Sequence, residues 1–158
     1  VNNAGIRKDN LLVWMEPEDF TRVLTTNLCS FYNVTRPLIT PMIRHKYGRI
    51  INMASLSGLK GLPGQCNYSA AKGGLIAATK ALAQEVGRKN ITVNAVAPGV
   101  ILTDMCANVE PEILAEMAEE APLGRNGTPM DVARAMEYLA NAQFVTGHIL
   151  NVDGGYVI

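Results

Sequence analysis

Hydrophobic and polar residues recur along the chain with two different spacings. Between residues 17 and 45 the apolar positions follow one another at intervals of three and four: Phe20, Val23, Leu24, Leu28, Phe31, Tyr32 and Val34. This spacing predicts a long helix, and the acidic residues at positions 16, 18 and 19 suit the positive dipole of its first turn. Because an interior proline removes a backbone donor, we expect a kink or a break at Pro37 and Pro41.

Helical spacing returns in three later segments. Residues 67–89 are rich in Ala, Leu and Lys and predict a second long helix, although Gly73 and Gly74 cost it roughly 1 kcal/mol each unless another backbone packs closely there. Residues 129–142 predict a helix with proline at its first position. Residues 103–121 are acidic and mixed, and we expect one or two short mobile helices there.

Short apolar runs bounded by turn residues alternate with these helices. Residues 50–53, 91–96 and 148–152 predict buried strands, and Val1 is interpreted as the last residue of another one. Residues 55–64 are rich in glycine and contain a proline, so we expect a loop without a regular element. Strands that alternate with helices predict an α/β fold with a mostly parallel sheet.

Composition narrows the class of protein. The 158 residues, 48% hydrophobic and 18% charged, fit one globular domain and exclude disorder as the main state. The formal net charge is zero, and no apolar run approaches the length of a membrane span, so we expect neither a nucleic-acid nor a membrane partner. Three widely spaced cysteines suit no disulfide framework and no zinc site, which favours a reducing cytoplasm and no bound metal.

Tyr68 and Lys72 stand four residues apart at the start of a predicted helix, so their side chains project from one face. An ammonium group beside a tyrosine favours the phenolate and lowers the pKa of the phenol toward the range of proton exchange near neutral pH. Taken alone, such a pair is also typical of an ordinary exposed helix face. Asn3, Ser55 and Pro98 all fall at ends of predicted strands, where open parallel sheets bind ligands.

Six motifs in order carry a resemblance: NNAG at residues 2–5, Asn27 within TTNL, Ser55 within MASLSG, YSAAK at 68–72, NAVAPG followed by VILTDM at 94–105, and NVDGG at 151–155. Together they resemble the short-chain dehydrogenase/reductase family, and within it the bacterial β-ketoacyl-acyl carrier protein reductases. Singly, each motif residue has an ordinary explanation as a helix amide, a loop serine or a strand terminator.

The resemblance implies a catalytic set of Asn27, Ser55, Tyr68 and Lys72. Tyr68 protonates the substrate carbonyl oxygen as hydride arrives, and Ser55 hydrogen-bonds that oxygen. Lys72 lowers the pKa of Tyr68 and binds the nicotinamide ribose. Asn27, in a helix irregularity, holds a water that links Lys72 to solvent.

The resemblance also implies a dinucleotide cofactor, NADPH with NADH left open. Its ribose and nicotinamide meet two groups of residues besides Tyr68 and Lys72: Asn3, Ala4 and Gly5, and Pro98, Gly99, Ile101 and Thr103. Members of the family bind the pyrophosphate at a glycine-rich turn after their first strand, and this sequence has no such turn. We therefore expect residues 1–158 to form a single partial domain, the C-terminal portion of a doubly wound Rossmann-like sheet without the N-terminal glycine-rich βαβ units.

The implied reaction is reduction of a ketone to an alcohol, with 3-oxoacyl-acyl carrier protein giving the 3-hydroxyacyl product. Two alternatives stay open: a short-chain dehydrogenase for a sugar, steroid or small alcohol, and an inert truncated oligomerisation module. A partial domain exposes a sheet edge and an apolar face. The resemblance places a homodimer or homotetramer contact on the two long helices.

Overall fold

Three parallel strands form the sheet at the centre of the computed structural model, which describes residues 1–107 and 109–157. The strands are β1 (Gly48–Met53), β2 (Ile91–Pro98) and β3 (Ile149–Val152), in the order β1-β2-β3. Gly48 lies opposite Ile91 at one end of the β1–β2 pair, and Met53 lies opposite Val96 at the other. The predicted α/β fold with a parallel sheet is confirmed.

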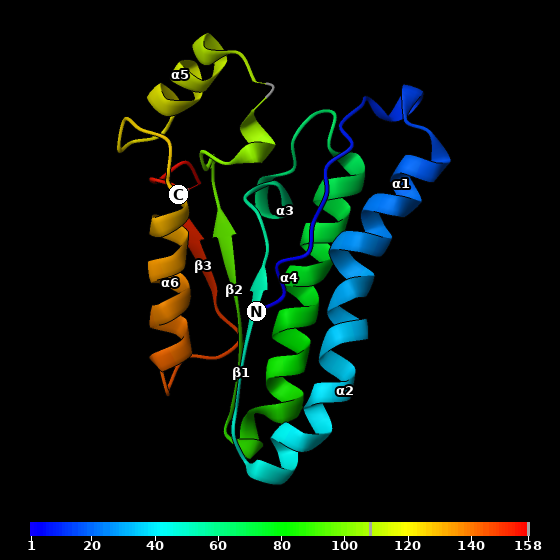
Figure 1. Cartoon of the computed structure of the whole chain (residues 1–158), viewed down its shortest axis with the longest axis vertical. Helices are drawn as coiled ribbons and strands as arrows, with labels where there is room; N and C mark the ends of the chain where they lie inside the picture. Colours follow the sequence, from blue (N-terminus) through cyan, green and yellow to red (C-terminus); the bar gives the residue numbers. More distant parts are fainter. Residues whose placement is uncertain (108, 158) are drawn as a thin grey trace.

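Helices cover both faces of this sheet (Figure 1). One face carries α1 (Pro17–Leu24), α2 (Ser30–His45) and α4 (Cys66–Val86), and the other carries α6 (Pro129–Asn141). Apolar side chains of β1 and β2 pack against α4 in one core cluster and against α6 in another. Because both faces are covered, β2 is buried along nearly its whole length, as the doubly wound arrangement requires.

The first long helical segment is irregular near Asn27, as the resemblance implied, and is not broken at its two prolines. α2 continues through Pro37 and Pro41, so a break at these prolines is wrong. Both prolines lie on the solvent side, where water can bond the carbonyls that they leave without a partner. The irregularity is instead a π-helical turn, Thr25–Cys29, between α1 and α2.

A short helix, α3 (Ser57–Lys60), lies in the segment predicted to be a loop. Its Gly58 allows a close approach to α4, because a Cβ at this position would lie 2.7 Å from the backbone carbon of Lys72 and 2.8 Å from the nitrogen of Gly73. The close packing of the two backbones therefore requires glycine at position 58, whereas a Cβ at Gly73 would lie 3.4 Å from Gly58 O, an ordinary contact.

The remaining elements are short. Three 3₁₀ turns are Leu12–Trp14, Gly87–Lys89 and Asp104–Cys106, and the acidic segment also contains α5 (Pro111–Glu120). One or two short helices were predicted in the acidic segment, and its described residues contain two, Asp104–Cys106 and α5. Their mobility stays a prediction. Within the described ranges, no helix combines the length and apolarity needed to cross a membrane.

The N-terminal residue does not end a buried strand, as Val1 is 73% exposed. The backbone nevertheless runs parallel to β1 at the next position, where Asn2 donates to Ile51 O and accepts from Met53 N, both at 2.9 Å. Only this one residue pairs with the free edge of β1 among those described. The N-terminal segment is thereby held at the carboxyl end of the sheet.

Candidate active site

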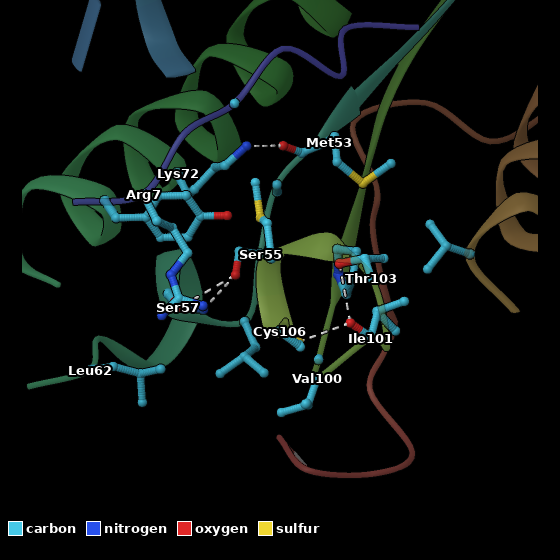
Figure 2. A pocket seen from close by; sticks show the side chains of 18 of the residues that line it. Arg7, Met53, Ser55, Ser57, Leu62, Lys72, Val100, Ile101, Thr103 and Cys106 are labelled. Carbon is cyan, nitrogen blue, oxygen red and sulfur yellow. Dashed lines mark hydrogen bonds between the residues drawn. The ribbon is translucent and has the colours of Figure 1, made fainter. Parts of the chain in front are cut away.

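A cavity of about 420 Å³ opens at the carboxyl ends of β1 and β2. Most of the residues singled out in the sequence line it: Asn3, Gly5, Ser55, Tyr68, Lys72, Pro98, Gly99, Ile101 and Thr103. Figure 2 shows Ser55 and Lys72 on one side and Val100, Ile101 and Cys106, from the segment after β2, on the other. The fold thus brings together residues that lie up to a hundred positions apart.

Two predicted residues do not line the cavity. Ala4 is exposed and lies outside its wall. Asn27 is buried behind the wall, within the π-helical turn, where its Nδ2 donates to the carbonyls of Ile6 and Val23, both at 2.9 Å. The helix irregularity expected at Asn27 is therefore confirmed, and irregular turns of this kind recur at functional sites.

The amide oxygen of Asn27 is buried and has no hydrogen-bond partner in the part of the chain that the structure describes. Gly5 lies over it: a Cβ at position 5 would lie 2.8 Å from Asn27 Oδ1 and 3.7 Å from Lys72 Nζ. The missing side chain leaves a small space that both polar groups face. An acceptor and a donor that face one space can share a water or a ligand hydroxyl.

Tyr68 and Lys72 lie in the first turns of α4, and both are buried. Lys72 Nζ donates to Met53 O at 2.6 Å and lies 5.5 Å from the centre of the Tyr68 ring. Burial lowers the pKa of Lys72 to about 8. This lysine is consequently poised to gain or lose a proton close to neutral pH.

The expected lowering of the Tyr68 pKa by Lys72 is not observed. Burial raises the pKa of Tyr68 above its ordinary value, and the groups that oppose this rise are the Ser55 hydroxyl, by hydrogen bonding, and the Arg7 guanidinium. The physical reason is that removing a phenolate from water outweighs the attraction of nearby positive charge. Tyr68 is therefore protonated at neutral pH and can donate a hydrogen bond or a proton.

Sequence reasoning missed a polar group beside this pair. Arg7 lines the cavity and forms an ion pair with Asp9, and Asp9 also accepts a hydrogen bond from Gln65 Nε2 at 2.9 Å. Gln65 in turn accepts from the hydroxyl of Ser57. Asp9 and Gln65 are 56 residues apart, and no local spacing indicates that they meet.

The wall farthest from these polar groups is apolar and was also missed. It is formed by side chains of the acidic segment, α5 and α6: Met105, Val109, Leu114, Met117, Val132 and Met136. Their spacing in the sequence indicates only helix faces, and the role as a cavity wall depends on how α5 folds over the sheet. Among the described residues no cluster of three or more His, Cys, Asp or Glu is arranged to hold a metal ion.

A family model described as enoyl-(acyl carrier protein) reductase matches residues 1–157. The 3-oxoacyl-[acyl-carrier-protein] reductase FabG of Chlamydia muridarum is 50% identical over 157 residues, and that of Haemophilus influenzae is 45% identical over the same length. These matches cover 98% of this chain but only 63% and 65% of the two relatives. The chain thus spans a little under two thirds of their length.

Solved structures agree with the sequence relatives. A 3-oxoacyl-[acyl-carrier protein] reductase from Brucella melitensis superimposes with a TM-score of 0.94 at 38% identity, over 99% of this chain and 62% of that one. A putative gluconate dehydrogenase from Agrobacterium tumefaciens superimposes with a TM-score of 0.95 at 34% identity, over 99% of this chain and 64% of that one. One fold with the same parallel core therefore serves proteins named for different substrates.

Proposed function

Because this chain belongs to the short-chain dehydrogenase/reductase family, we propose that it carries the catalytic centre of a nicotinamide-dependent reductase that converts a ketone to an alcohol. The substrate that we propose is a 3-oxoacyl thioester of acyl carrier protein, which gives the 3-hydroxyacyl thioester. One observation carries the proposal: Ser55, Tyr68 and Lys72 meet at one wall of a cavity whose opposite wall is apolar.

The residues present fit a dinucleotide at its nicotinamide end. One N–H of the buried Lys72 ammonium donates to Met53, and the other two have no protein partner in residues 1–107 or 109–157, which leaves them for ribose hydroxyls. The space over Gly5 lies beside this ammonium group. When bound, the reduced nicotinamide supplies the hydride.

The proton chemistry belongs to the chain itself. Tyr68 is the general acid in this proposal, since its raised pKa keeps the phenol protonated at neutral pH, ready to donate to a substrate carbonyl oxygen. The Ser55 hydroxyl hydrogen-bonds the same oxygen and orients it. Lys72, with a pKa of about 8, holds a proton that can replace the one lost by Tyr68, and Asn27 Oδ1 offers an acceptor for a water on that path.

The apolar wall favours an acyl chain over a sugar acid. Met105, Leu114 and Met117 face the cavity from the acidic segment and α5, where a polyhydroxylated substrate would need hydrogen-bond partners. The likeness to a putative gluconate dehydrogenase keeps an alcohol or sugar acid as the second candidate. The inert oligomerisation module is the third, and activity of the chain itself separates it from the other two.

We propose NADPH in preference to NADH, on the resemblance to bacterial 3-oxoacyl-acyl carrier protein reductases. The three cysteines are all free, which supports a reducing compartment, and we propose the cytoplasm. The single partial domain spanning residues 1–158 stays a prediction. We also propose that the chain forms a homodimer or homotetramer.

Titration of the protein with NADPH and NADH tests the proposal first, with fluorescence of the sole tryptophan, Trp14, and of the reduced nicotinamide as readouts. A second assay follows oxidation of the cofactor in the presence of an acetoacetyl thioester of acyl carrier protein. Tight, saturable binding with reduction of the thioester is the expected result. If neither cofactor binds at millimolar concentration, the proposal that this chain is an active reductase is wrong.

Tyr68→Phe is the matched variant for this assay. It removes the phenolic proton and leaves the ring, so we expect cofactor binding within about twofold of the wild type and a fall in turnover of at least about 100-fold. Ser69→Ala, one residue along α4, is the control and keeps wild-type turnover. Equal turnover of Tyr68→Phe and the wild type removes Tyr68 as the general acid.

A further inference from the structure

A guanidinium group lines the cavity at the point where the cavity meets solvent. Arg7 belongs to the cavity wall, yet its side chain is 37% exposed. Figure 2 shows Arg7 on the same side of the cavity as Lys72. Hydrogen bonding to Asp9 is the main cause of a raised Arg7 pKa, and Tyr68 and Cys106 add to this rise through their charges. The guanidinium is therefore charged at neutral pH and lies within electrostatic reach of both sides of the cavity.

Hydrogen bonds tie this guanidinium to buried side chains. Arg7 Nε donates to Asp9 Oδ2 at 3.1 Å, and Arg7 Nη2 donates to the same oxygen. Asp9 Oδ2 also accepts from Gln65 Nε2 at 2.9 Å, and Gln65 Oε1 accepts from the hydroxyl of Ser57 at 2.8 Å. Gln65 and Ser57 are both buried. A guanidinium held in this way is oriented before a ligand arrives, which reduces the entropy that binding costs.

The pair with Asp9 leaves part of the guanidinium free to donate. An arginine side chain has five N–H groups, and Asp9 bonds to the edge that contains Nε and Nη2. No acceptor for Nη1 is present in residues 1–107 or 109–157. Because the guanidinium is planar, Nη1 lies on the edge turned away from Asp9. A molecule in the cavity that Arg7 lines can therefore accept hydrogen bonds from this second edge.

The charge of Asp9 and the shape of the cavity indicate which acceptor fits. Asp9 already balances the charge of Arg7, and it repels a second carboxylate brought to the same guanidinium, so a neutral carbonyl oxygen fits better. A 3-oxoacyl thioester has such an oxygen on its thioester carbon, two carbons from the ketone. Its acyl end suits the apolar wall of the cavity, so its thioester end points toward solvent, where the Arg7 side chain is partly exposed.

We propose that Arg7 is a specificity-determining residue that donates hydrogen bonds to the thioester carbonyl oxygen of the substrate, while the ketone oxygen lies at Ser55 and Tyr68. Arg7 thereby distinguishes a 3-oxoacyl thioester from a simple ketone of the same size. The inference rests on the proposed function for the class of substrate and for the place of its ketone. Its test, however, requires neither cofactor nor turnover.

The experiment measures how tightly the chain binds two matched ketones, by ligand-observed NMR without cofactor. One is the acetoacetyl thioester of N-acetylcysteamine, and the other is the same molecule with a methylene group in place of the thioester carbonyl. We expect the wild type to bind the thioester at least about 10-fold more tightly, because the second ketone cannot accept from Arg7. Arg7→Met removes the donors at similar side-chain length and should abolish this preference. Arg7→Lys keeps the charge with fewer donors and should retain part of it.

Lys8→Met is the matched control, because it removes one positive charge from the next position, where the side chain does not line the cavity. This variant should keep the wild-type preference. Equal affinities of the two ketones for the wild type overturn the proposal, as does a failure of both to bind or a preference that survives in Arg7→Met. Tighter binding of free acetoacetate than of the thioester also overturns it, because the guanidinium then selects a carboxylate. A preference that depends on Arg7 in a chain that reduces no ketone contradicts only the proposed function.

Discussion

Lys72 links the chemistry of single residues to the stability of the fold. Its ammonium group is buried, its hydrogen-bonded partner is a neutral carbonyl, and no carboxylate bonds to it within the described ranges. Burial without a counter-ion disfavours the charged form, which is why its pKa lies at about 8 rather than at 10.5. The buried ammonium group of Lys72 therefore makes the folded chain less stable at neutral pH, and it can release its proton readily.

The pH dependence of stability follows from this shift. Between pH 8 and pH 10.5 the unfolded chain holds a proton on Lys72 that the folded chain has released, so the free energy of unfolding rises with pH in this window. We expect a gain of about 2 kcal/mol from pH 8 to pH 10. Above pH 10 the raised pKa of Tyr68 acts in the opposite sense, since the unfolded chain then loses its phenolic proton first.

Urea denaturation at pH values about half a unit apart, between pH 7.5 and pH 10, measures this dependence. Lys72→Met removes the titrating group and should flatten the curve. Lys80→Met, at an exposed position on the same helix, is the control and should leave the slope as in the wild type. Parallel curves for the wild type and Lys72→Met would show that Lys72 titrates normally in the folded state.

At the scale of elements, the contact between α3 and α4 sets the position of the site. α3 begins at Ser57, two residues after Ser55, and α4 carries Tyr68 and Lys72. The distance between the two helices therefore sets how far Ser55 lies from that face of α4. Gly58 allows that distance, because no side chain separates the backbones there. The short helix therefore acts as a spacer between the loop after β1 and the face of α4 that carries Tyr68 and Lys72.

Gly58→Ala tests this spacing. The added Cβ meets backbone atoms of Lys72 and Gly73, which cannot move aside as a side-chain end can, and we expect a loss of about 2 kcal/mol in the free energy of unfolding. Gly87→Ala is the control, since a Cβ there meets nothing within 4 Å. Thermal or urea denaturation measures both variants, and equal stabilities would mean that α3 has room to move away from α4.

The sequence was sufficient to predict the helices and strands that depend on the spacing of neighbouring residues. The spacing of apolar residues predicted the order of helices and strands, and the ends of the strands placed Ser55 and Pro98 at the cavity. The helix irregularity at Asn27 was expected from the resemblance and not from the spacing of residues. The hydrogen bond between Asp9 and Gln65 depends on a contact between distant segments, for which local spacing carries no signal. The predicted break at the prolines of α2 was wrong for a related reason. The free-energy cost of a proline inside a helix depends on whether it faces water or the sheet.

At the scale of the whole molecule, the outer surface of the helical layer carries a stripe of exposed apolar residues. Exposed positions one turn apart on α2 form a stripe of apolar residues: Val34, Pro37, Leu38 and Pro41. α4, on the same face of the sheet, exposes small residues at helical spacing: Cys66, Ala70, Ala77 and Ala81. Small residues let a second helix approach closely, and bulky apolar ones gain free energy when it does.

We expect this surface to mediate self-association of the chain, in accord with the proposed homodimer or homotetramer. Val34→Glu combined with Leu38→Glu places two charges in the stripe, and burial of unpaired carboxylates opposes association. Size-exclusion chromatography with light scattering should show a dimer or larger assembly for the wild type and a monomer for the double variant. Met130→Glu is the control, because Met130 is an exposed apolar residue on α6, on the other face of the sheet. A monomeric wild type, or a double variant that associates as the control does, places the contact elsewhere.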